Sequence, residues 1–269
     1  TVLIESFIQG KEFSCIVVED ESGRPVALPP TEIRKGKELF DYRSKYLPGL
    51  SRKITPIQLP DSQIEAIRTS CEKLFSDLHF NVYARIDGFV REDGTILLND
   101  PNTTSGMMPS SFFFHQAAEI GMNPSQFITY ILRTSLRSRI SDFKQYGKVN
   151  MLLRRLDQLI DNNRKQEKTK VRAAVILGGY SSERHISVES GRNIYEKLSS
   201  SDKYDVMPVF LSGSSNAHEL YTIPINILLK DNADDIREKI EHFEIHPIIS
   251  RIIEQCGGLT QRFARSRNL

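Results

Sequence analysis

The sequence predicts an α/β protein in two parts: a mixed sheet with helices, then a small parallel α/β domain. Three observations lead to this prediction. Residues 1–143 alternate β-rich segments with segments of helical periodicity. Residues 144–172 end in a polar, charged tract, which we interpret as a helical and polar linker. Residues 173–269 open with an apolar strand, a glycine turn, a helix and a second strand, the order of a βαβ unit.

Composition limits what this protein does. The 269 residues are 39% hydrophobic and 26% charged, which is typical of globular proteins with a sizeable core. The net charge of +2 gives no support for a nucleic-acid partner. No apolar run approaches the roughly 20 residues of a membrane-spanning helix, so no membrane partner is expected. The three scattered cysteines, Cys15, Cys71 and Cys256, argue against a disulfide framework or zinc site and favour a reducing, cytoplasmic location.

The elements of the first part follow from periodicity and turn signals. Residues 1–35 read as a hairpin, and an Asp-Gly pair joins two later strands. Asn123 and Gln126 form a capping-box signal, with a proline at the first helical position. We expect helices over 61–79, 110–120 and 123–144 and strands over 82–90 and 95–98. Residues 36–60 form a long polar loop of the kind that closes over a site.

The second part begins with residues 173–177, a continuous apolar run suited to a buried parallel strand. A glycine turn, a helix over 187–198 and a strand over 204–211 follow, so the crossover should be right-handed. Two further helices are expected over 233–243 and 246–256. The chain starts at Thr1 inside a strand-like run without a secretory signal, so we expect a piece of a longer chain.

One group of polar residues suggests a cation site. Arg85 and Asp87 face the same way, because side chains alternate along a strand. The hairpin turn then returns Asp100 and Asn102 to the side of Asp87. Carboxylate and amide oxygens suit Mg²⁺ that is also held by substrate phosphates. We call Asp87, Asp100 and Asn102 the acidic cluster; the alternative is that they are ordinary polar residues of a strand end and a loop.

Two loops are candidate anion sites. The Gly-Gly turn at 178–179 precedes a helix N-terminus, with Glu183 at its mouth as an amine ligand. This turn matches neither the dinucleotide nor the P-loop pattern, and a simple tight turn is the alternative. The loop through Gly106 to Ser111 offers an amide and hydroxyl groups to a carboxylate or an oxyanion, and a helix cap is the alternative. His115 is expected to be a packed or surface residue.

Taken in order, these features resemble D-alanine–D-alanine ligases, members of the ATP-grasp superfamily. The resemblance in the first part is carried by residues 2–13, 40–46, 84–87 and 102–107. A second match, over 174–191, resembles the opening strand, glycine turn and helix of the same family. The resemblance implies that residues 1–143 are a C-terminal ATP-grasp lobe and that residues 173–269 are an N-terminal-type domain of a second unit.

The resemblance also implies a reaction: ATP- and magnesium-dependent joining of two D-alanines through an acyl phosphate, for cell-wall peptidoglycan precursors. The acidic cluster would hold two Mg²⁺ ions, or Mn²⁺ in their place. Glu5, Phe7 and Ile8 would frame the adenine, and Glu12 would bind the ribose. Lys45 would reach the phosphates of ATP from a mobile loop.

The remaining roles that the resemblance implies concern the substrates. Tyr46 would close over them. Arg85 and the Gly106 amide would stabilise the tetrahedral intermediate. Ser111 would take the carboxylate of the second D-alanine, and Glu183 would help position the ammonium of the first.

The chain departs from the family in three ways. Asp100 stands where the family usually has Glu. The C-terminal lobe precedes the N-terminal-type domain, and neither the central lobe nor the usual His-Gly-x-x-Gly-Glu-Asp-Gly segment is found. Residues 212–269 match nothing in the family. We therefore expect a fragment of a tandem fusion, inactive alone, from a homodimer or a larger parent chain. The alternatives are a degenerate scaffold or dimerisation module, or a ligase for another amino or hydroxy acid.

Overall fold

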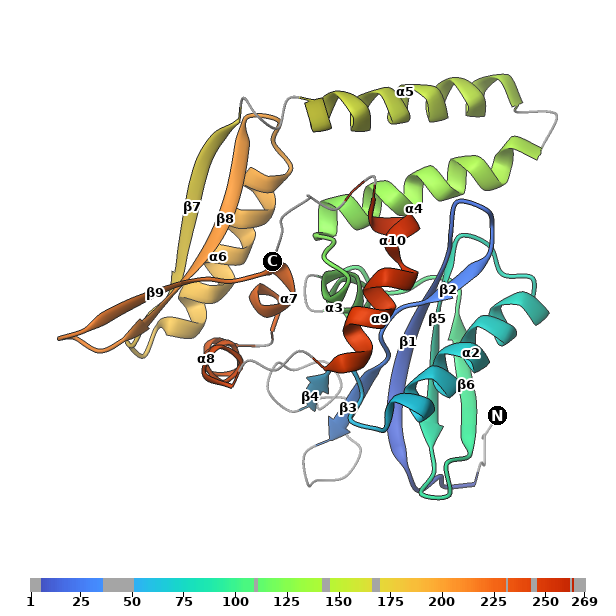
Figure 1. The fold of residues 1–269 in the computed structure, drawn as a ribbon, viewed down its shortest axis with the longest axis horizontal. Coiled ribbons are helices and arrows are strands. Elements are labelled where there is room, and N and C mark those ends of the chain that lie inside the picture. Colours follow the sequence, from blue (N-terminus) through green and yellow to red (C-terminus); the bar gives the residue numbers. More distant parts are fainter. Residues whose placement is uncertain are drawn as a thin grey trace, which may run out of the picture.

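The structure is a computed structural model that describes residues 6–35, 51–108, 111–141, 146–165, 170–230, 232–242, 246–261 and 263. Glu5, Lys45 and Tyr46 lie outside the described residues, as does the expected strand at the start of the chain. The described residues form two sheets (Figure 1). Each sheet has its own apolar core. None of their helices is both long enough and apolar enough to span a membrane.

The first sheet is antiparallel in all its strand pairs and has the order β4-β3-β1-β5-β6, with β2 beside β1. Its strands are β1 (Lys11–Glu19), β2 (Pro25–Ala27), β3 (Thr31–Lys35), β4 (Ser51–Ile54), β5 (Tyr83–Val90) and β6 (Ile96–Asn102). β1 is central and is buried from Phe13 to Val18, which fits its run of β-branched and aromatic residues. β6 extends to Asn102, so the expected loop from residue 99 is strand at first.

Three helices build the first core around this sheet: α2 (Asp61–Asp77), α3 (Phe112–Glu119) and α4 (Pro124–Ser138). The capping box of Asn123 and Gln126 is present at the start of α4, as expected. α2 begins at Asp61, the expected position, and its N-cap residue is Pro60. Gln116 of α3 accepts from the Ile16 N–H at 2.8 Å and donates to Ser14 O at 2.8 Å. Its side chain therefore completes the hydrogen bonding of β1 where β2 and β3 leave a gap.

The second sheet has the order β7-β8-β9, and its first pair is parallel. The βαβ unit is confirmed: β7 (Val171–Gly178), α6 (Arg184–Ser199) and β8 (Tyr204–Gly213) follow one another and pack together. β9 (His218–Thr222), α7 (Ile225–Leu228) and α8 (Ala233–Glu241) follow, of which the sequence predicted only α8. A Cβ on Gly191 would lie 2.5 Å from Leu177 Cβ, so glycine permits the close approach of α6 to β7.

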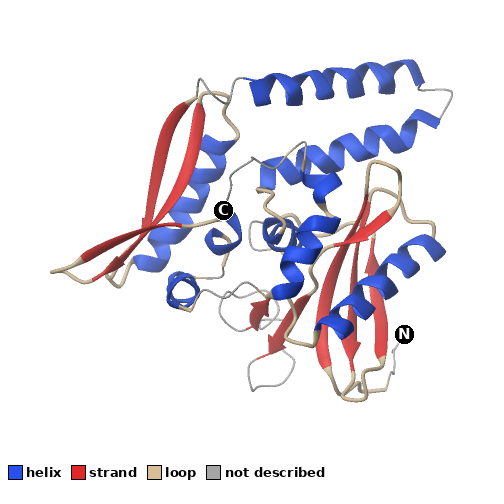
Figure 2. Cartoon of the chain, viewed as in Figure 1, coloured by secondary structure: helices blue, strands red, loops and turns tan. Residues whose placement is uncertain are grey.

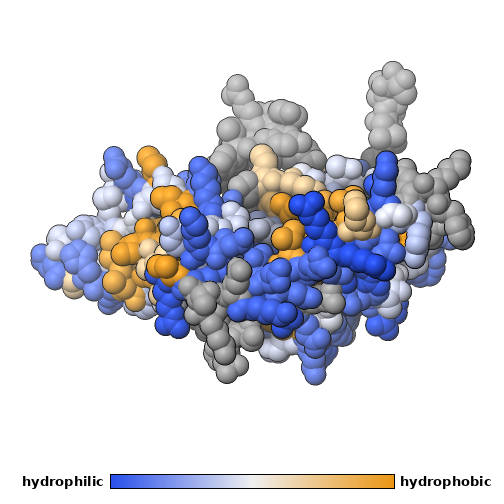
Figure 3. Space-filling model, turned by 90° about the horizontal axis from the view of Figure 1, so that it is seen from above, coloured by the Kyte–Doolittle hydropathy of each residue, from blue (hydrophilic) through white to orange (hydrophobic). Residues whose placement is uncertain are grey.

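Two helical segments connect the sheets. α5 (Tyr146–Lys165) packs beside α4 and continues through part of the tract expected to be polar linker (Figure 2). Met151, Leu152 and Leu159 of α5 are exposed, and Figure 3, which looks down on this side, shows apolar groups scattered among polar ones. α9 (Pro247–Gln255) and α10 (Gly257–Thr260) return to the first core, where their apolar side chains are buried: Ile248, Ile252, Cys256 and Leu259.

Candidate functional site

The acidic cluster lies at an irregularity in the pairing of β5 with β6. Arg85 is opposite Asn102, but Asp87 is opposite Asn99, so β6 has one extra residue between them. Asp100 stands at this bulge with a positive φ of 46°, a conformation that Asp tolerates better than most residues. Without the extra residue, Asn99 and Asn102 would face opposite sides of the sheet. The bulge therefore turns Asn102 to the face that carries Asp87.

Asp87 is held by its neighbours on this face. Arg85 donates to both of its carboxylate oxygens, at 3.1 and 3.0 Å, and Ser14 Oγ donates to Oδ1 at 2.7 Å. Burial nevertheless raises the pKa of the Asp87 carboxyl above its usual value; Arg85 and Ser14 act in the opposite direction, and nearby Asp100 adds to the rise. A divalent cation bound by the Asp87 and Asp100 carboxylates would compensate for the burial of Asp87 and for the repulsion between the two acids. The chemistry of the cluster therefore suits a metal ion.

The donor set of the cluster is two carboxylates and one amide. Asn102 Nδ2 donates to the backbone carbonyl of Asp100 at 2.7 Å, so its Oδ1 is the atom suited to bind a cation. Among the described residues, no group of three or more His, Cys, Asp or Glu side chains could hold a metal. With two carboxylates and one amide, the cluster would leave part of the coordination of a cation to phosphate oxygens or water.

Ser111 occupies the N-cap position of α3, but its hydroxyl does not cap the helix. Its Oγ is buried and has no hydrogen-bond partner among the described residues. A buried hydroxyl without a partner is costly, which makes this atom a candidate for binding a ligand. On the next residue, Lys53 Nζ lies 5.5 Å from the centre of the Phe112 ring. The Ser111 hydroxyl can donate a hydrogen bond to a carboxylate.

The other expected site residues of the first part are less enclosed. Gly106 is exposed, in the loop between β6 and α3. Phe7 is 86% exposed and Ile8 is half-buried, both before β1. Glu12 is half-buried on β1, opposite Phe89 of β5.

Glu183 stands alone at the start of α6. It is exposed, and no hydrogen bond or ion pair within the described part of the chain connects it with the first sheet. Next to it, Arg184 binds both carboxylate oxygens of Asp234 on α8 at 2.9 Å. The two glycines of the turn have positive φ, but the N–H of Gly178 donates to Ser187 Oγ and that of Gly179 to Leu211 O. The turn therefore has fewer amides for an anion than its sequence suggests.

Sequence reasoning missed three residues of this region. Ser14 binds Asp87, and its signal was a hydroxyl in the middle of an apolar strand. Lys53 has no motif around it. Glu119 of α3 is buried and accepts hydrogen bonds from Lys230 Nζ at 3.1 Å and from Asn226 Nδ2 at 3.0 Å. These bonds connect the first part of the chain with the second. His115, one turn before Glu119, is packed as expected.

Comparisons with known proteins identify one family along this chain. The family model for the C-terminus of D-ala D-ala ligase matches residues 1–133, and the model for its N-terminus matches residues 172–248. D-alanine–D-alanine ligase B of Clostridium perfringens is 34% identical over 139 residues, 52% of this chain and 44% of its own. The D-alanine–D-alanine ligase of Acetivibrio thermocellus is 33% identical over 146 residues, which are 54% of this chain and 38% of its own.

A solved D-alanine–D-alanine ligase of Bacillus anthracis, complexed with ATP, is 30% identical over 50% of this chain and 42% of its own, with a TM-score of 0.41. The chain thus spans less than half the length of the curated relatives it matches. The two family models lie in reverse order along it, C-terminus first, and together they cover most of its residues. On this evidence the chain belongs to the D-alanine–D-alanine ligase family.

Proposed function

We propose that this chain is part of an ATP- and magnesium-dependent ligase that joins two D-alanines in the cytoplasm for cell-wall precursor synthesis. The observation that carries the proposal is the acidic cluster beside Arg85, within a segment that matches the C-terminal domain of these ligases. Residues 1–143 would be the ATP-grasp lobe, 144–172 the linker and 173–269 the N-terminal-type domain. The working protein would be a homodimer or a longer tandem chain.

The residues of the lobe suit phosphoryl transfer and amide formation. Asp87, Asp100 and Asn102 would hold Mg²⁺, which neutralises charge on the transferred phosphoryl group. Arg85 is already oriented along the strand by Asp87. Once a cation takes over the Asp87 carboxylate, the Arg85 guanidinium would be released to stabilise an oxyanion with the Gly106 amide.

The orphaned hydroxyl of Ser111 supports a carboxylate subsite at the start of α3. The Ser111 hydroxyl would donate a charge-assisted hydrogen bond to the carboxylate of the second D-alanine, which would supply the partner that the hydroxyl lacks. Lys45 and Tyr46 would cover the reacting groups, and Glu5, Phe7, Ile8 and Glu12 would bind the nucleoside, as in the family. Glu183 would reach the first D-alanine only in a complex that brings its turn to this lobe.

Cation binding tests the proposal directly. We expect Mn²⁺, followed by its electron paramagnetic resonance signal, to bind this chain and to be displaced by Mg²⁺. Asp87→Asn should weaken binding about tenfold or more, because a carboxylate ligand is lost. Glu92→Gln, in the exposed β5–β6 turn, is the matched control and should bind as the natural chain does.

Two outcomes separate the alternatives. No binding of Mn²⁺ alone or with ATP would overturn the enzyme assignment and favour a scaffold or dimerisation module. We expect no D-alanine-stimulated phosphate release from this chain alone, since it spans less than half the length of the curated relatives it matches. A longer parent protein that releases phosphate when D-lactate or D-serine is the second substrate, but not when D-alanine is, would be a ligase for another amino or hydroxy acid.

A further inference from the structure

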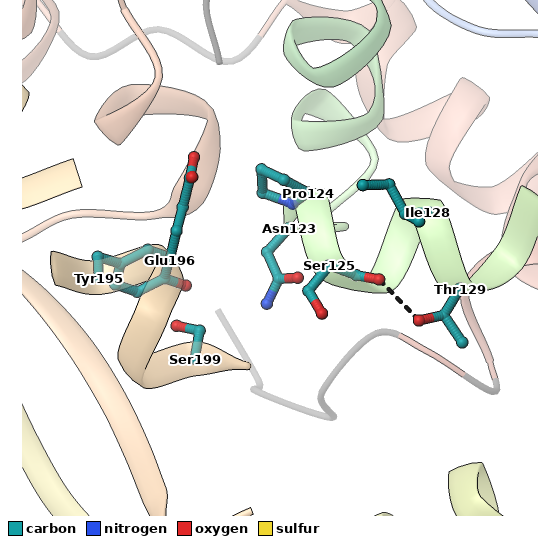
Figure 4. Close-up of a pocket in the computed structure, with 8 residues that line it drawn as sticks. All are labelled: Asn123, Pro124, Ser125, Ile128, Thr129, Tyr195, Glu196 and Ser199. Atoms are coloured by element: carbon teal, nitrogen blue, oxygen red, sulfur yellow. Dashed lines mark hydrogen bonds between the residues drawn. The ribbon is translucent and has the colours of Figure 1, made fainter. Parts of the chain in front are cut away.

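The boundary between the two parts of the chain is not packed along its whole length. A cavity of about 280 Å³ separates the start of α4 from the last turn of α6 (Figure 4). A second cavity, of about 270 Å³, lies between β4 and α8, and Lys53 and Lys230 are among the residues that line it. The contact of α3 with α7 is therefore important for holding the second sheet against the first part.

This contact combines apolar and polar groups. Leu229, directly after α7, is buried in the core of the first sheet, and Ile225 of α7 packs against both cores. Glu119 of α3 accepts from Lys230 Nζ at 3.1 Å and from Asn226 Nδ2 at 3.0 Å. We call these five residues, together with the two helices that carry them, the α3–α7 joint.

His115 lies within this joint. It is four residues before Glu119 on α3, so the two side chains are neighbours on one face of the helix. His115 is only 8% exposed, and its Nε2 has no hydrogen-bond partner among the described residues. A buried ring nitrogen without a partner tolerates the neutral imidazole better than the charged one, because burying an unpaired charge costs far more.

The charges that act on the His115 imidazole come from three other elements. They are Lys53 of β4, Lys230 after α7 and Arg192 of α6, and all three are cations. The acid in the joint is Glu119, which Lys230 already occupies. β1 and α4 also pack against α3, and they contribute apolar side chains to the shared core. A proton on His115 would thus stand beside cations or compete with Lys230 for Glu119.

Protonation of His115 and docking of the second sheet therefore oppose each other. Burial, reinforced by the three cations, lowers the pKa of His115 well below its ordinary value. When the joint is open, the imidazole would face water and titrate near its ordinary pKa of about 6.5. The open form thus binds the proton more readily. Docking is strongest above pH about 6.5 and weakens as pH falls below that value.

We propose that His115 makes the α3–α7 joint a pH-sensitive switch, which is closed while His115 is neutral and opens when His115 takes up a proton. The opening would be intramolecular, because α5 packs beside α4 and α9 packs in the core of the first sheet. The second sheet would thus remain tethered at both ends. The switch concerns how the two parts are held together and does not depend on the proposed ligase function.

The test is native-state hydrogen exchange of the full chain at pH 7.5 and pH 5.5, corrected for the intrinsic exchange rates. The probe is the Leu229 amide, which donates to Ile225 O in the closed joint. We expect its protection to fall roughly tenfold, which is the change for one group that titrates near pH 6.5 only in the open form. Protection at Leu229 should be lower than at Val17 of β1, because the joint opens while the first sheet stays folded.

Two variants isolate the role of the imidazole. His115→Gln cannot titrate, so its Leu229 protection should change less than twofold between the two pH values. His218→Gln, on the exposed strand β9, is the matched control and should keep the tenfold change. If His115→Gln does not fold, the proton resonances of the His115 ring in the natural chain give the answer, since they should titrate well below pH 6.5.

Several results would overturn the proposal. One is a Leu229 protection factor that does not change with pH, or that changes equally in His115→Gln. Another is equal protection at Leu229 and Val17, which would mean that the joint opens only when the first sheet unfolds. A His115 ring that titrates near pH 6.5 in the folded chain would also overturn it.

Discussion

Replacing Ile252 by Ala tests whether α9 belongs to the core of the first sheet. Ile252 is fully buried there, although it lies far along the chain in the part expected to form a separate domain. The substitution removes three carbons, worth roughly 0.8 kcal/mol each, and leaves a cavity. The expected loss is about 3–4 kcal/mol of unfolding free energy, or roughly 6–15 °C in melting temperature for a chain of this size.

The assay is native-state hydrogen exchange of the β1 amides, together with thermal unfolding followed by circular dichroism. Exchange at Ile16 and Val17 should accelerate in Ile252→Ala, because α9 covers the same core as β1. Ile186→Ala is the matched control: Ile186 is 67% exposed on α6, so its loss should change stability by no more than about 0.5 kcal/mol. If β1 exchange is unchanged while the second sheet loosens, α9 does not support the first core and this reasoning is wrong.

Three further predictions concern charged and titratable groups. Glu119→Ala leaves Lys230 without its partner, so unfolding in urea should show a loss of about 2–3 kcal/mol; an unchanged midpoint would mean that the pair contributes nothing to docking. Burial acts to raise the pKa of Glu32, but the Arg34 hydrogen bond and other donors outweigh it and lower that pKa. The stability that the ionised Glu32 carboxylate contributes is thus present above its unfolded-state pKa of about 4.3 and is lost as pH falls through its folded-state pKa. Glu32→Gln should therefore destabilise the chain at pH 7 and have the same stability as the natural chain in acid. A stability difference that does not change with pH would contradict this. Burial raises the pKa of Cys256 to about 12, so alkylation of this thiol at pH 8 should occur only at the rate of unfolding, and rapid modification would show that α9 is displaced.

The sequence predicted which helices and strands form better than it predicted which of them pack together. The βαβ unit and the capping box at Asn123 follow from local patterns, and both are present. Short-range patterns carry no signal for β9, whose five residues are all exposed. They also did not reveal that α9 packs on the first core, because an amphipathic helix shows which of its faces is buried but not what covers it.

The candidate site shows the same division between local and long-range information. Strand alternation placed Arg85 and Asp87 on one face, and the structure pairs them directly. The bulge at Asp100 was not predictable, because an extra residue in a strand depends on its pairing with the neighbour. Ser14 was missed for a related reason: its contact with Asp87 spans 73 positions in the sequence.

The packing of α9 has a consequence for how the two family-related segments depend on each other. The match to the C-terminal ligase domain ends at residue 133, and the match to the N-terminal domain ends at residue 248. Most of the apolar side chains that α9 and α10 place in the first core therefore come from residues that neither family model covers. Phe263 packs edge-on against Tyr130 of α4, and Gln255 accepts from the buried Arg68 guanidinium at 2.6 Å. If the first sheet and its helices were separated from this segment, they would expose that apolar surface and Arg68 would lose one of its partners. In this chain the segment after the second family match therefore completes the first core.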